Sequence, residues 1–277
     1  MEAVTFQALN AQVKGYLWDD YDTLAAHKLR PALVICPGGG YHWCSPREKD
    51  APALEFLSLG FQVFVLEYTC YPEDMSNFRP LRELAQCVCT LRERGEAWHI
   101  DRDKIAVLGF SAGGHLAGCA GTMWNRPEIY RPLKKKSPAF RPDGVILCYP
   151  VITSGDKAHQ ESFVNLLGDR YDELLDSVSL EKRVTKKSPP MFLWHTADDT
   201  TVPLENSLLM AEALKAKGVE HELRVFPHGA HGQSLADRTV YAPDKLYLLS
   251  VPCSVWVNYC DAWIQHHFCQ PVYEYNT

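Results

Sequence analysis

A serine held between two glycines is the feature of this sequence that most directly indicates chemistry. Gly109-Phe110-Ser111-Ala112-Gly113 ends the apolar run KIAVLGF and opens a segment with helical spacing. A serine nucleophile of this kind sits on a strained strand-to-helix turn that lifts its hydroxyl clear of the sheet. Glycines on both sides remove side chains that would clash where strand and helix meet. The pattern predicts Ser111 as a nucleophile, and a turn that only packs a helix tightly is the alternative.

A serine nucleophile needs a base and a carboxylate that orients the base. MFLWHTADDTTVP carries Asp198 and Asp199, and VFPHGAHGQS carries His228 and His231. We predict Asp199, because of its Asp-x-x-Val-Pro spacing before the next helix, and Asp198 stays open. We predict His231, because small residues around it leave room for an imidazole to reach across, and His228 stays open. The chain order Ser, Asp, His is one in which such groups occur.

Backbone amides must stabilise the oxyanion that forms when such a serine attacks an acyl group. One expected donor is the residue after the nucleophile, Ala112, and others come from a glycine loop after an earlier strand. CPGGGY provides that loop, and we expect Gly39 and Gly40 as donors, with Gly38 not separated from them. A phosphate cradle is excluded because neither G-K-[ST] nor G-x-G-x-x-G spacing is present.

Three aromatic residues lie in or near the loops of the predicted site. Aromatic faces suit sugar rings, and they suit other apolar substrates as well. We expect substrate contacts from Tyr41, Trp43 and Trp124. Packing in the core or at the rim is the alternative for each of them.

Short apolar runs and runs of helical spacing alternate along the chain, which determines how these residues are positioned. Antiparallel edge strands are predicted over residues 4–9 and 12–18, and further strands over 32–36, 61–67, 104–110, 144–150, 191–195 and 222–226. Helices are predicted over residues 51–59, 77–94, 113–123, 203–217 and 250–267. The apolar stripe of the last helix is expected to be Val251, Val255, Tyr259 and Trp263. This alternation predicts an α/β fold with a mostly parallel sheet, where ligands bind at the carboxyl ends of strands.

Composition fits one globular domain over residues 1–277. Hydrophobic residues make up 46% and charged residues 22%, which excludes a disordered or fibrous chain. Residues 152–190 break the alternation and are predicted to be a lid-like insertion. The net charge of −6 gives no global attraction to nucleic acid or anionic lipid.

No apolar run is long enough for a membrane span, and the first residues lack the pattern of a secretory signal. We therefore expect a cytoplasmic protein whose thiols stay reduced. Five of the ten cysteines lie in apolar patterns and are predicted to be buried free thiols: Cys36, Cys87, Cys119, Cys148 and Cys260.

We predict no metal site and no cofactor. Cys87-x-Cys89 and His266-His267 lack the further partners that a metal site needs. His228 and His231 share a zinc-like spacing, but no helix and no glutamate accompany them.

Four separated segments, CPGGGY, GFSAGGHLAG, PPMFLWHTADDTTVPLENS and FPHGAHG, resemble bacterial α/β-hydrolases related to acetyl-xylan esterases. The resemblance runs from about residue 31 to residue 232. It implies an eight-stranded α/β-hydrolase sheet and a triad of Ser111, Asp199 and His231. It also implies that SFVNLLG is a lid segment. Pro37 stands where many lipase-type relatives have histidine, which favours the esterase branch.

The resemblance implies two-step acyl transfer that removes acetyl or another short acyl group from a sugar or xylo-oligosaccharide, without a cofactor. The partner is then a small-molecule or oligosaccharide ester, and a homo-oligomer is left open. A prolyl-oligopeptidase-type peptidase, a lipase or long-chain esterase, and a non-catalytic binding protein are the alternatives. The first would normally carry a large extra domain, the second an apolar lid, and the third would lack a triad member.

Overall fold

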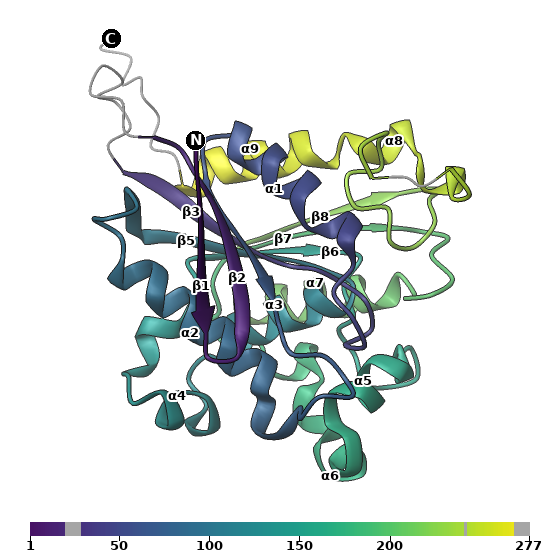
Figure 1. Cartoon of the computed structure of the whole chain (residues 1–277). Helices are drawn as coiled ribbons and strands as arrows, with labels where there is room; N and C mark the ends of the chain where they lie inside the picture. Colours follow the sequence, from purple (N-terminus) through teal and green to yellow (C-terminus); the bar gives the residue numbers. More distant parts are fainter. Residues whose placement is uncertain (20–28, 241–242, 269–277) are drawn as a thin grey trace.

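Eight strands form a single sheet in this computed structural model, with helices on both faces (Figure 1). The structure describes residues 1–19, 29–240 and 243–268. The strands are β1 (Glu2–Ala8), β2 (Ala11–Leu17), β3 (Arg30–Cys36), β4 (Gln62–Glu67), β5 (Ile100–Phe110), β6 (Gly144–Cys148), β7 (Met191–Thr196) and β8 (His221–Phe226). Each predicted strand is present, with shifts only at its ends.

The sheet is mostly parallel, as predicted. Its order is β1-β2-β4-β3-β5-β6-β7-β8. β1 pairs antiparallel with β2, and β2 antiparallel with β4, whereas all pairs from β4 to β8 are parallel. The α/β-hydrolase architecture expected from the sequence is thereby confirmed. The carboxyl ends of the parallel strands meet at one edge, where the loops after β3, β5, β7 and β8 come together.

Helices cover the two faces of the sheet and bury two apolar layers. On one face lie α1 (Asp50–Ser58) and α9 (Trp256–Phe268), whose side chains Phe56 and Trp256 are fully buried in one cluster. On the other lie α2 (Arg79–Glu93), α3 (Ala112–Met123) and α7 (Glu205–Lys217). Burying one such large apolar side chain stabilises the fold by roughly 1.5–3 kcal/mol. The shorter helices are α4 (Pro127–Leu133), α5 (Gln160–Leu167), α6 (Tyr171–Leu174) and α8 (Val251–Ser254).

The C-terminal helix differs from its prediction in two ways. The expected single helix is divided into α8 and α9. The expected stripe is largely wrong, because Val251 is 82% exposed and Tyr259 is 40% exposed, although Trp263 is buried as expected. The buried face instead follows Trp256, Val257, Cys260, Trp263 and Ile264. Because 3.6 residues make one helical turn, residues spaced four apart drift by about 40° around the helix at each step. A helix face that stays buried therefore needs a mixture of three-residue and four-residue spacings.

The segment between β6 and β7 packs onto the main core. It contains α5, α6 and three short 3₁₀ turns at Gly168–Arg170, Leu175–Val178 and Leu180–Lys182, and no strand lies within residues 152–190. Val178 and Leu180 are fully buried. The ring Nε2–H of His115, on α3, donates to the Val178 carbonyl at 2.8 Å. The insertion is therefore fixed to the helix that follows Ser111.

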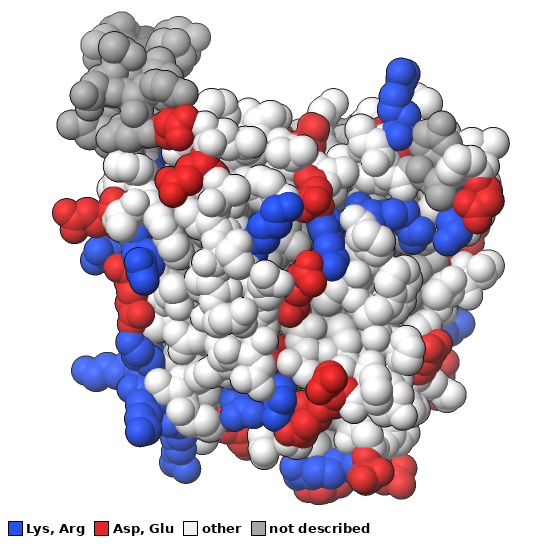
Figure 2. Space-filling view, viewed as in Figure 1, with Lys and Arg blue, Asp and Glu red and all other residues white. Residues whose placement is uncertain are grey.

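The five cysteines predicted to be buried free thiols are buried and free. Cys269, the tenth cysteine, lies outside the described residues. In the part of the chain that the structure describes, no helix is both long and apolar enough to cross a membrane. On the face seen in Figure 2, basic and acidic side chains lie beside one another, near the centre as well as around the rim.

Candidate active site

Ser111 lies at the sharp turn between β5 and α3, with φ 54° and ψ −118°. A side chain on Gly109 would place its Cβ 2.0 Å from the Gly113 carbonyl oxygen. A side chain on Gly113 would place its Cβ 2.1 Å from the Cys36 carbonyl oxygen. The turn therefore requires both glycines, as the sequence predicted. The Ser111 amide donates to the Cys148 carbonyl at 3.0 Å, which anchors the turn to the end of β6.

Ser111, His231 and Asp199 form one hydrogen-bonded line. His231 Nδ1 is 2.7 Å from Asp199 Oδ2, and His231 Nε2 is 2.8 Å from Ser111 Oγ. Because a carboxylate only accepts, Nδ1 carries the proton, and Nε2 is left to accept from the serine hydroxyl. The loops after β5, β7 and β8 thus bring together the three residues that the sequence selected.

Asp199 is held ionised in a buried position. Burial alone would raise the pKa of its carboxyl, but hydrogen bonds from His195 and His231 outweigh burial and lower the pKa well below its usual range. Its other oxygen, Oδ1, accepts from the amides of Thr201 at 2.9 Å and Val202 at 3.0 Å. The carboxylate is fixed by donors on both oxygens.

Asp198 and His228, the two alternatives that the sequence left open, form a pair with each other. Asp198 Oδ2 lies 3.0 Å from His228 Nδ1, and Asp198 Oδ1 accepts from the Gly229 amide at 2.8 Å. The His228 side chain is mostly exposed. This pair ties the loop after β7 to the loop after β8, while the neighbouring residues Asp199 and His231 face Ser111.

A second histidine, His195, lies beside the Asp199 carboxylate, and the sequence did not lead us to expect it there. It is fully buried at the end of β7. Its Nε2 lies 2.9 Å from the Val202 carbonyl, which only accepts, so Nε2 carries the proton. The same Nε2 lies 3.4 Å from Asp199 Oδ2, and Nδ1 accepts from the Ser207 hydroxyl at 2.8 Å. A histidine inside an apolar strand, four residues before the aspartate, was the available signal.

The three glycine amides in the loop after β3 are not equivalent as donors to an oxyanion. The Gly38 amide donates to Glu48 Oε2 at 2.7 Å and so is not available to an oxyanion. The amides of Gly39, Gly40 and Ala112 have no acceptor among the described residues. Gly39 and Gly40 have φ values of +128° and +64°, a backbone conformation that glycine adopts without strain.

Glu48, a buried carboxylate that sequence reasoning missed, connects this loop to the histidine loop. Besides the Gly38 amide, it accepts from the Tyr149 hydroxyl at 2.7 Å. That hydroxyl accepts from the Ser234 amide at 2.8 Å, and the Tyr149 ring packs 5.0 Å from the His231 ring. Burial raises the pKa of Glu48, against the lowering effect of these hydrogen bonds and of His231. No local motif marks this glutamate.

The three aromatic candidates separate into one exposed and two buried residues. Tyr41 is buried, and its hydroxyl donates to His115 Nδ1 at 2.8 Å, so its ring is a core element. Trp124 is buried at the end of α3 opposite Ser111. The expectation that these two contact substrate is therefore corrected. Trp43 is 51% exposed and lies against Gly39, and its contact with substrate remains a prediction.

The sequence matches the model of the BD-FAE family over residues 19–214, well over half of the chain. The chain belongs to the BD-FAE family. It is 39% identical over 212 residues to endo-1,4-beta-xylanase B of Butyrivibrio fibrisolvens, covering 75% of this chain and 33% of that protein. It is 30% identical over 209 residues to the acetylxylan esterase of Xylanibacter ruminicola, covering 73% and 40%. This BD-FAE chain thus spans less than half the length of these two relatives.

Solved structures resemble the BD-FAE chain over nearly its full length. The acetyl ester-xyloside bifunctional hydrolase from Caldicellulosiruptor lactoaceticus has a TM-score of 0.80 and 33% identity, with 97% of each chain covered. A carboxylesterase from Lactobacillus plantarum WCFS1 has a TM-score of 0.85 and 26% identity, with 98% of this chain and 99% of that chain covered.

Proposed function

We propose that this chain is a carboxylic ester hydrolase that uses Ser111 to remove acetyl or other short acyl groups from sugars or xylo-oligosaccharides. The observation that carries the proposal is the hydrogen-bonded line from Ser111 Oγ through His231 to Asp199. The amides without acceptors beside it supply what an oxyanion needs. Relatives named as esterases belong to the same enzyme class.

The reaction proceeds in two steps. Ser111 Oγ bonds to the ester carbonyl carbon while His231 Nε2 takes the hydroxyl proton, and the carbonyl oxygen becomes an oxyanion facing the free amides. The oxyanion then collapses, the bond to the alcohol oxygen breaks, and His231 gives its proton to the leaving alcohol. Water, activated by His231, attacks the acyl-serine and releases the acid. Asp199 holds the imidazole in the required tautomer and stabilises its charged form.

A small acyl group on a sugar is the substrate that the relatives favour. Two of the proteins that resemble this chain are named for acetylxylan and for an acetyl ester-xyloside. The exposed ring of Trp43 lies beside the glycine loop, where an aromatic face could pack on the apolar face of a sugar ring. The sugar would therefore lie on the alcohol side of the scissile bond, next to that loop.

Acetate release tests the proposal. Acetylated xylo-oligosaccharides and an aryl acetate are assayed with the wild type and with Ser111→Ala. Both substrates should be hydrolysed by the wild type. The kcat of the Ser111→Ala variant should be lower by up to about 10⁶-fold. Asp199→Asn should lower kcat by about 10⁴-fold, because the wrong imidazole tautomer is then favoured.

Asp198→Asn is the matched control, because its carboxylate pairs with His228, and its kcat should stay within a few-fold of wild type. Hydrolysis of the aryl acetate alone would reject the sugar substrate and keep the serine mechanism. A wild type that hydrolyses neither ester, or a Ser111→Ala variant that keeps full activity, would reject the function.

A further inference from the structure

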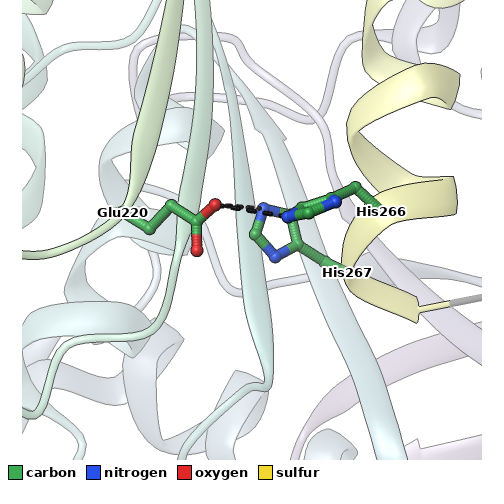
Figure 3. Close-up of side chains that lie close together, drawn as sticks. All are labelled: Glu220, His266 and His267. Atoms are coloured by element: carbon green, nitrogen blue, oxygen red, sulfur yellow. Dashed lines mark ion pairs between the residues drawn. The ribbon is translucent and has the colours of Figure 1, made fainter.

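Two histidines in the last turn of α9 meet a glutamate that immediately precedes β8 (Figure 3). The sequence predicted no metal site here, because the neighbours of His266 and His267 offer no third ligand. The fold supplies that ligand from a distant part of the chain. Among the described residues, Glu220, His266 and His267 are the group of three whose ligand atoms lie close enough to hold a metal ion.

The spacing of the three ligand atoms is close to that of a metal site. Glu220 Oε1 lies 3.5 Å from His266 Nε2 and 3.7 Å from His267 Nε2, and all three atoms lie within 4.8 Å of one another. Neighbouring ligands of a tetrahedral zinc ion are about 3.3 Å apart, given metal–ligand bonds near 2.0–2.1 Å. The side chains of His266 and Glu220 are 72% and 64% exposed and are free to make this small adjustment.

We propose that Glu220, His266 and His267 form a binding site for a divalent transition-metal ion of the zinc type. Two imidazole nitrogens and one carboxylate oxygen match the ligands that Zn²⁺ accepts, whereas Ca²⁺ and Mg²⁺ prefer sites built from oxygen alone. Three protein ligands leave the fourth position to water. The C-terminal end of α9 adds the negative end of the helix dipole, which favours a cation there.

The surroundings of the site support this assignment. The three residues line a hollow of about 190 Å³ together with side chains from β8 and α9. Among the described residues that line it, Arg224 carries a guanidinium, which is paired with Glu222 at 2.6 Å and lies over the Tyr259 ring. That pairing partly neutralises the positive charge that would oppose a metal ion. The His267 ring packs 4.5 Å from the Trp263 ring, which holds one ligand in place.

The site is separate from Ser111. Glu220 precedes β8, whereas His231 follows the opposite end of that strand. An ion bound here would connect the end of α9 to the edge strand of the sheet. Its expected effect is on the stability of the fold, with ester hydrolysis unchanged, so failure of this proposal leaves the proposed function untouched.

Calorimetric titration of ZnCl₂ into the full chain tests the proposal, with any histidine tag removed and trace metal stripped by a chelator. One ion per chain should bind at neutral pH, and CaCl₂ should give no binding. Glu220→Gln and His266→Asn should each weaken the Kd by about tenfold or more, as losses in metal coordination shells do. His228→Asn, an exposed histidine elsewhere, should leave the Kd unchanged.

Thermal unfolding gives a second measurement on the same proteins. At a Zn²⁺ concentration about a hundredfold above the Kd, the Tm of the wild type should rise by about 5 °C, and the two ligand variants should show a much smaller shift. Absence of zinc binding would overturn the proposal. So would zinc binding that Glu220→Gln and His266→Asn leave unchanged, or equal binding of calcium.

Discussion

Glu48 contacts both the glycine loop and the tyrosine that packs against His231. Its two carboxylate oxygens accept from Gly38 in the glycine loop and from Tyr149 beside His231. We expect Glu48→Gln to lower kcat for an aryl acetate by about 10- to 100-fold with little change in KM. An amide presents only one acceptor oxygen, so one of the two hydrogen bonds is lost, and misplacement by about 1 Å can cost 100-fold in rate.

The matched control for this prediction is Glu67→Gln, because Glu67 pairs with Lys49 at the surface. Its kcat should equal that of the wild type. Tm is measured for both variants, so that loss of folded protein is separated from loss of rate. A Glu48→Gln variant that folds and keeps the wild-type kcat would show that Glu48 is not a positioning residue.

At the scale of elements, α5 of the insertion is hydrogen-bonded to the glycine loop. The Asn165 side-chain amide donates to the Gly40 carbonyl at 2.9 Å. We expect Asn165→Ala to lower kcat by about fivefold, because the hydrogen bond that fixes the loop is worth about 1 kcal/mol. KM should change less, since the variant removes no contact with substrate. Steady-state kinetics on an aryl acetate measures both constants.

Val164→Ala changes the neighbouring residue of the same helix, whose side chain is exposed. It should leave kcat unchanged. Equal losses in the two variants would mean that helix stability, and not the hydrogen bond to Gly40, controls the loop.

The strands and helices, and the hydrogen-bonded line of Ser111, His231 and Asp199, could be predicted because their sequence signals are local. The central strands are short apolar runs, and Ser111, Asp199 and His231 each follow a strand within a few residues. The order of those runs then determines which loops meet at the carboxyl edge of the sheet. Glycine spacing around Ser111 identifies the turn without knowledge of the rest of the fold.

The remaining features depend on partners far away in the chain. Glu48 is recognisable only once Tyr149 lies beside it, and Asn165 only once it lies over Gly40. Tyr41 sits in a loop sequence typical of a binding surface, yet its hydroxyl finds His115 in the core and its ring is buried. Exposure of a loop aromatic is therefore decided by tertiary contacts, which a single sequence does not contain.

At the scale of the whole molecule, His115 joins three parts of the fold. On α3, it accepts from Tyr41 of the glycine loop and donates to Val178 of the insertion. Because Val178 offers only a carbonyl, Nε2 carries the proton and Nδ1 is the acceptor. Burial lowers the pKa of His115 to about 4. The neutral ring is thus the form that holds the glycine loop, α3 and the insertion together.

This burial makes stability depend on pH in a definite direction. An unfolded histidine titrates near pH 6.5, so between pH 6.5 and about 4 the unfolded chain binds a proton that the native chain does not. Stability therefore falls as pH falls through that window, by about 3 kcal/mol in total from this group. In His115→Gln this contribution is absent, while other titrating groups such as Asp199 are kept in both proteins. Urea unfolding at several pH values should give a wild-type free energy of unfolding that declines more steeply with acid than that of the variant, and parallel curves would contradict a buried neutral His115.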